Sequence, residues 1–209
     1  MRQTLRTAIL LAFACTGLAV FSNFAQAQKL DVAFGVSTVT APSASFSNGF
    51  ETAPSLSGGA YPGFSFDGIF WHHLGIGTEI YWKASQSDNY LGSGFNYRPL
   101  YYAFNAVYSP KLANHTYLEL VAGMGAMSTR IYSGTVCGPY NCSNYQSFNH
   151  FMGDFGAGVK FYVKGGFFIR PEARVYLIDN NTVNSNNVGY SSSYSTRVGG
   201  SIGYTFGGH

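Results

Sequence analysis

The sequence predicts an all-β fold, an eight-stranded antiparallel up-and-down β-barrel that spans a membrane, and three observations favour it. Aromatic residues make up 17% of the 209 residues and charged residues only 10%, whereas about a quarter of a typical soluble domain is charged. Beyond the first 27 residues, apolar and polar side chains alternate with a period of two, as they do in half-buried strands. The connections between these segments alternate between long and short, which is typical of barrels that cross a membrane.

The first 27 residues have the three parts of a secretory signal peptide. Arg2 and Arg6 give a positive start, an apolar run covers 8–21, and Ala25-Gln26-Ala27 places small residues where a signal peptidase reads them. We therefore expect cleavage after Ala27 and a barrel domain over 28–209. Cleavage leaves ten basic residues against nine acidic ones, so the composition does not indicate a basic patch for nucleic acid.

Two cysteines remain in the exported chain, Cys137 and Cys142. A close pair in an exported protein predicts a local disulfide bond, because the compartment is oxidising. The bridge closes a short loop, so its stabilisation is expected at the low end of the usual range. The metal interpretation is weak, since two sulfurs without a second pair do not complete a tetrahedral site.

Period-two alternation is clearest over 150–163, where Phe151, Phe155 and Val159 share one face while Asp154 and Lys160 share the other. No apolar stretch after Ala27 approaches the roughly 18 residues of a membrane helix. Strands are instead expected near residues 30–40, 60–71, 75–85, 97–109, 116–128, 149–163, 167–179 and 194–206.

The predicted connections fall into two classes. The short ones are 72–74, 110–115 and 164–166. The long ones are rich in Ser, Asn, Gly and Tyr, and they are 41–59, 86–96, 129–148 and 180–193. Long loops on one side and tight turns on the other form the layout of a transmembrane barrel, and an even number of strands leaves both termini on the short-turn side, the periplasm.

Charged residues lie almost entirely on the face opposite the apolar one. A charge on the lipid side costs about 2–4 kcal/mol for Arg or Lys at mid-bilayer, whereas charges in the narrow interior of eight strands can pair with one another. We therefore predict a lumen plugged by ion pairs and hydrogen bonds. Its network is expected to contain Glu79, Lys83, Glu119, Asp154, Lys160, Arg170, Glu172, Arg174 and Arg197, joined by Asp31 and Asp67. Arg98 is the exception: it shares the parity of the outer face and is expected at the rim, beyond the hydrocarbon.

A soluble, lipocalin-like barrel would place the same charges on a wet exterior and line its cavity with the apolar face. Aromatic residues gather at the strand ends, and such clusters favour the interfacial girdles of a membrane barrel. These residues are Phe70, Trp71, Tyr81, Trp82, Tyr101 and Tyr102.

The pattern, the segment Gly-Ala-Gly-Val-Lys-Phe-Tyr-Val at 156–163 and the last strand at 201–206 resemble the small eight-stranded outer-membrane barrels, the OmpA-like transmembrane domain and the OmpX-like proteins. The resemblance implies location in a Gram-negative outer membrane, contact with outer-membrane lipid, and insertion by the barrel-assembly machinery, which in that family reads a last strand ending in Phe. Here Gly207-Gly208-His209 follow Phe206, a departure from that signal.

Some barrels of this kind are lipid A-modifying enzymes that use His, Ser and an acidic residue at the outer rim. Only His150 is expected to reach that rim, with Ser147 and Asp154 near it in sequence. Asp154 lies about 13 Å away along one strand, which is beyond hydrogen-bond reach. Adjacent strand residues such as His72 and His73 point to opposite faces and chelate poorly. We therefore expect no catalytic, cofactor-binding or metal-binding residue.

The sequence thus indicates a monomeric, non-enzymatic membrane barrel with a structural or surface-interaction role through its long loops. Its composition does not define a surface ligand. Three alternatives stay open at this point: a narrow pore for small solutes, a lipid A-modifying enzyme, and a soluble binding barrel.

Overall fold

A computed structural model describes residues 29–41, 56–90, 95–132, 136–137, 142–179 and 194–207. The side chains of residues 87–90, 95, 136–137, 142–143 and 146 lie outside this description. The predicted signal peptide and its cleavage position after Ala27 also lie outside it. None of the described residues forms a helix with the length and hydropathy that a membrane crossing requires.

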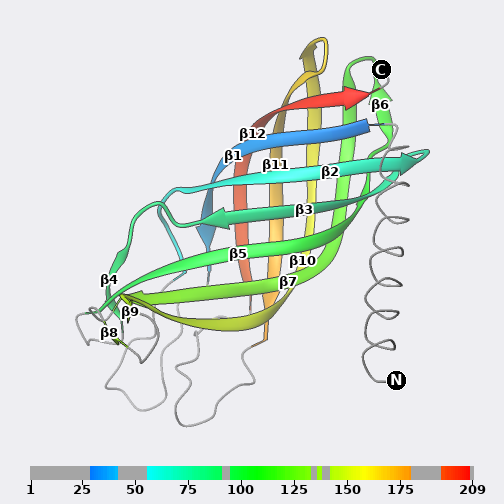
Figure 1. Ribbon diagram of the computed structural model, residues 1–209. Coiled ribbons are helices and arrows are strands. Elements are labelled where there is room, and N and C mark those ends of the chain that lie inside the picture. The colour runs from blue at the N-terminus through cyan, green and yellow to red at the C-terminus, as the bar shows by residue number, and fades with distance from the viewer. Residues whose placement is uncertain are drawn as a thin grey trace, which may run out of the picture.

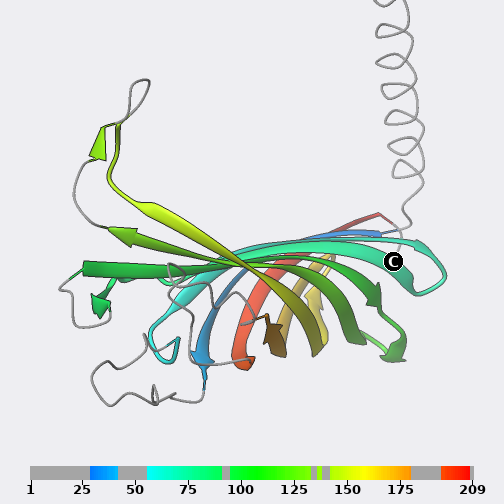
Figure 2. The same ribbon diagram turned by 90° about the horizontal axis from the view of Figure 1, so that it is seen from below.

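Eight long antiparallel strands form a closed barrel, which confirms the predicted fold class. Each strand pairs with its sequence neighbours among the eight, and pairing of the last strand with the first completes the ring. The strands are β1 (Lys29–Thr40), β2 (Tyr61–Trp71), β3 (Leu74–Trp82), β5 (Phe95–Tyr108), β7 (Thr116–Tyr132), β10 (Gln146–Lys164), β11 (Phe167–Ile178) and β12 (Tyr194–Gly207). Figure 1 shows these strands running side by side, and Figure 2 shows the curvature of the sheet.

Four short strands lie in the connections between the long strands, and the sequence did not predict them. They are β4 (Ser87–Tyr90), β6 (Lys111–Ala113), β8 (Val136–Cys137) and β9 (Cys142–Ser143). The hairpin of β7 and β10 is also longer than predicted, because its ladder continues to the pair Ile131↔Gln146. The segment 129–148 is therefore mostly strand in its described part. Alternation is weaker there, since the neighbouring residues Ser128 and Thr129 are both buried.

The two ends of the barrel differ in their connections. Residues 72–73, 109–115 and 165–166 close one end, where β1 begins and β12 ends, while β4, β8 and β9 lie at the other end (Figure 1). His72 and His115 sit in these tight turns with positive φ angles of 51° and 69°, a conformation that short turns require. We name the first end the turn end and the second the loop end.

The side chains alternate between the lumen and the outer wall as the sequence predicts. Phe34, Phe104 and Phe155 are 42%, 70% and 49% exposed on the outer wall. Most of the charged side chains of the strands lie inside, where Asp31, Asp154 and Arg170 are almost fully buried. A continuous exposed apolar wall of this size is stable only against another apolar phase. Because the barrel interior is polar, this phase lies outside the barrel, and the hydrocarbon of a membrane provides it.

Candidate functional site

The part of the lumen nearer the turn end is organised around two cations. Lys160 of β10 contacts Asp31 of β1 at 2.5 Å and also pairs with Glu119 of β7. Arg170 of β11 donates from Nη1 to Asp67 at 3.1 Å and to Glu119 at 2.8 Å. These carboxylates come from three different strands, so the cluster ties opposite walls of the barrel together.

Arg170 also uses its remaining donors. Its Nη2 donates to Ser65 Oγ at 2.7 Å and its Nε to Ser201 Oγ at 3.0 Å. The charge pattern alone missed both serines. Their position on the lumen face of β2 and β12 is the signal in the sequence that identifies them, because a planar guanidinium buried among strands needs several acceptors.

A second cluster fills the middle of the lumen. Arg197 of β12 pairs with Glu79 of β3 and Glu172 of β11, each at 2.9 Å. Arg174 of β11 pairs with Asp154 at 2.9 Å and with Glu79 at 3.4 Å. Arg174 and Arg197 face each other across neighbouring strands, and the intervening carboxylates compensate the repulsion expected between two like charges in that position.

Glu172 links the two clusters. Its Oε2 lies 3.3 Å from Arg170 Nε and 3.7 Å from Arg174 Nη2, while Oε1 accepts from Arg197. Residues 170, 172 and 174 reach the same lumen because alternate residues of a strand share one face. The structure thereby brings together eight of the nine predicted network residues, with Asp31 and Asp67, in one connected set of ion pairs.

Aromatic rings cover the charged layer toward the loop end. Tyr101 stacks on Tyr176 with ring centroids 4.9 Å apart and packs against Tyr61 at 5.9 Å. Tyr176 donates to Glu79 at 2.8 Å and accepts from Arg197 at 2.7 Å. The Arg197 guanidinium lies over the ring of Tyr81, with its Cζ atom 3.6 Å from the ring centroid. This geometry adds a cation–π attraction.

The girdle interpretation of Tyr81 and Tyr101 is wrong. Both side chains are buried in the lumen, 1% and 0% exposed. The parity of Tyr81, shared with Glu79, already placed it on the inner face. Clustering of aromatic residues at strand ends favoured the outer surface, but large rings are also needed to fill the barrel interior above the ion pairs.

Two predicted residues lie apart from the ion-pair clusters. Lys83 directly follows β3 at the loop end, and burial lowers the pKa of its ammonium group. His150 is buried at 5% exposure and faces the lumen opposite Met127 of β7. Ser147 is exposed and has the opposite parity on β10, so this strand does not present Ser147 and His150 on one face.

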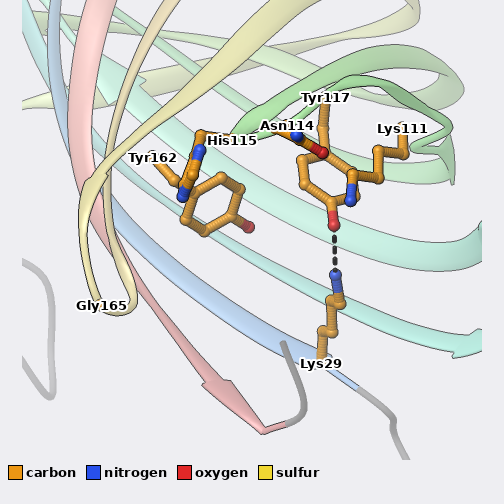
Figure 3. Close-up of a pocket in the computed structure, with 7 residues that line it drawn as sticks. All are labelled: Lys29, Lys111, Asn114, His115, Tyr117, Tyr162 and Gly165. Carbon is orange, nitrogen blue, oxygen red and sulfur yellow. Dashed lines mark hydrogen bonds between the residues drawn. The ribbon is translucent and has the colours of Figure 1, made fainter.

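A cavity of about 430 Å³ opens at the turn end of the barrel. Its lining includes Lys29, Lys111, His115, Tyr117 and Tyr162 (Figure 3). Lys29 Nζ donates to Tyr117 Oη at 3.3 Å and lies 4.4 Å from the centroid of that ring. Among the described residues, no group of three or more His, Cys, Asp or Glu side chains forms a metal site.

Cys137 and Cys142 are opposite each other in the small β8–β9 sheet. Their side chains lie outside the described residues, so the disulfide stays a prediction. The backbone pairing supports it, because directly opposed residues have the close Cβ atoms that a bridge requires.

Intact mass measurement of the exported protein checks both predictions from the sequence. We expect a chain that begins at Gln28 and takes up no alkyl group until it is reduced, and then takes up two, since Cys15 has been removed. Alkylation before reduction would contradict the disulfide. A mass that includes residues 1–27 would contradict the cleavage independently of the cysteines.

A closed barrel with an apolar outer wall and a charged, filled interior defines an integral membrane β-barrel. The family model described as "Outer membrane protein beta-barrel domain" matches residues 11–206. The chain belongs to this outer-membrane β-barrel family, which places it in an outer membrane and its outer wall against lipid.

Solved structures of outer-membrane proteins share this fold at low sequence identity. Ail of Yersinia pestis is 12% identical with a TM-score of 0.53, over 85% of this chain and 98% of that chain. Neisserial surface protein A is 13% identical with a TM-score of 0.54, over 85% and 96%. A major outer membrane protein of Thermus thermophilus is 11% identical with a TM-score of 0.51, over 85% and 99%. No curated protein sequence matches the chain.

Proposed function

We propose that the protein is a non-enzymatic outer-membrane barrel that anchors four long loops for contact at the cell surface. The observation that carries this proposal is the lumen, in which buried ion pairs join strands from opposite walls. An interior held together in this way supports a rigid scaffold and leaves recognition to the loop end, because binding residues are commonly carried by loops on a rigid frame.

The loop composition supports recognition of a partner without strong charge. The long connections at 41–60, 83–94, 133–145 and 179–193 contain many Ser, Asn, Gly and Tyr residues, the types that are enriched in antibody binding loops. Their only charged residues are Glu51, Lys83, Asp88 and Asp179. Ail, by contrast, was solved with the heparin analogue sucrose octasulfate. The few cations in these loops favour a hydrogen-bonding surface partner here.

Export and assembly complete the proposal. The signal peptide directs the chain across the inner membrane, and the barrel-assembly machinery then inserts it through the last strand. β12 pairs with β1 to close the ring, and Phe206 points outward near its end at 52% exposure. The closed ring of strands leaves no free long edge for pairing, which supports a monomer.

Planar-bilayer recording tests the closed lumen. We expect the purified barrel to give no stable single-channel steps, because Arg170, Arg174 and Arg197 with their carboxylates occupy its cross-section. Stable steps in the unaltered protein would instead favour the narrow-pore alternative.

The double variant Tyr101→Ala/Tyr176→Ala is the matched control for this recording. It removes the stacked rings at the loop end together with the hydrogen bonds of Tyr176 to Glu79 and Arg197, and it retains every charged residue of the ion-pair clusters. We expect it to stay silent as well, so steps in this variant alone would show that the rings and not the ion pairs close the barrel.

A further inference from the structure

Two arginines stand side by side on the outer wall near the loop end. Arg98 of β5 and Arg130 of β7 are direct partners in the ladder between these strands. Each has the parity of outward residues on its own strand, such as Phe104 on β5 and Met124 on β7, which are 70% and 62% exposed. Directly opposed like charges destabilise a pair of strands, so this position needs a source of negative charge.

Within the part of the chain that the structure describes, neither arginine has a carboxylate partner. Arg98 Nη2 makes one long hydrogen bond, 3.4 Å to the carbonyl oxygen of Ala84, and its buried Nε has no acceptor. The guanidinium of Arg130 lies over the Tyr145 ring, 4.9 Å from its centroid. The guanidinium of Arg98 lies 6.0 Å from the centroid of the Tyr132 ring. These cation–π contacts hold the two side chains in place but leave their charge uncompensated.

The pair borders a depression of about 260 Å³ whose other lining residues are apolar. Ile80, Trp82 and Leu100 lie on the hydrocarbon side of the arginines. Arg98 precedes Tyr108 by ten residues on β5, which corresponds to about 26 Å along the membrane normal for a strand tilted by about 40°. An apolar band about 25 Å tall therefore ends just below Arg98, at the depth of the lipid headgroups.

We propose that Arg98 and Arg130 bind the phosphate group of a lipid in the outer leaflet, with its acyl chains against Ile80, Trp82 and Leu100. The two guanidinium groups present several hydrogen-bond donors to one tetrahedral anion. Arginine binds phosphate in this geometry better than lysine does, because its planar fork can donate two hydrogen bonds at once. The two cations match the phosphate group of a phospholipid or glycolipid, and the apolar side chains directly below them match its acyl chains. A soluble anion would use only the arginines.

Fluorescence of Trp82 gives a local readout. The chain has two tryptophans, and Trp71 is exposed at the turn end, so the variant Trp71→Phe leaves Trp82 as the reporter. This protein is reconstituted in phosphatidylcholine bilayers with a small fraction of either brominated phosphatidic acid or brominated phosphatidylcholine, whose bromine atoms quench a tryptophan that they touch. We expect the relative binding constant to favour phosphatidic acid by about tenfold, the worth of one charge-assisted contact.

Two variants with the same change in charge separate this site from the general attraction of a cationic protein. Arg98→Gln/Arg130→Gln should reduce the preference to about 1, because both forks are lost. Lys111→Gln/Lys164→Gln, at exposed positions of the turn end, should leave it at about tenfold. A preference that survives in the arginine variant, or disappears equally in both variants, would overturn the proposal.

Inorganic phosphate separates the two sources of the anion. Added in large excess, it should leave the preference for phosphatidic acid unchanged, because the acyl chains contribute to binding. Loss of the preference on adding inorganic phosphate would show that the arginines form a site for free anions, and the lipid assignment would then be wrong.

Discussion

Replacing Arg170 by Met is expected to destabilise the folded barrel by about 3–5 kcal/mol, the usual cost of removing one partner from a buried ion pair. The substitution leaves Asp67 and Glu119 without the donor that lies 3.1 and 2.8 Å from them. It also removes the hydrogen bonds to Ser65 and Ser201. Urea unfolding of the barrel in phospholipid vesicles measures the change in the free energy of unfolding.

Two variants make this result specific to the buried network. Arg170→Lys retains the positive charge but loses most of the guanidinium donors, so its loss should be intermediate. Lys164→Met removes an exposed cation at the end of β10 and should change the free energy of unfolding by less than about 0.5 kcal/mol. A loss below about 1 kcal/mol for Arg170→Met would mean that water or another cation replaces the guanidinium.

Replacing Phe155 by Arg should cost about 2–4 kcal/mol, as for a cation on the lipid face at mid-bilayer. Phe155 is 49% exposed on the outer wall of β10, between Ala122 of β7 and Val175 of β11. The charged head must leave water, and the neighbouring residues provide no carboxylate. Unfolding in vesicles of phosphatidylcholine reports this cost directly.

Phe155→Ala separates the cost of the charge from the loss of the ring, because it removes apolar contact and introduces no cation. We expect it to be clearly less destabilising than Phe155→Arg. Equal stability of the arginine variant and the unaltered protein would place the outer wall in water, contrary to the membrane assignment. A smaller penalty in a thinner bilayer would support it, since the arginine could then reach the headgroups.

The sequence determined the architecture because alternation is a local property. Each strand must present one face to hydrocarbon and the other to the interior. Residues two positions apart share a face, so Phe155 and Ala157 lie on the outer face while Asp154 and Gly156 lie on the inner one. The same rule assigned the buried charges to the lumen, because the lipid face cannot hold them.

Only the tertiary structure decided which of these charges meet. Arg197 and Glu79 are far apart in sequence and reach 2.9 Å through the closure of the ring, and Arg98 meets Arg130 because β5 and β7 are neighbours in register. The parity of Tyr81 and Tyr101 already assigned both to the inner face, and the structure decided that their rings pack against the ion pairs. Alternation states which face a side chain occupies, whereas its partners depend on strand register and on the space that the opposite wall leaves.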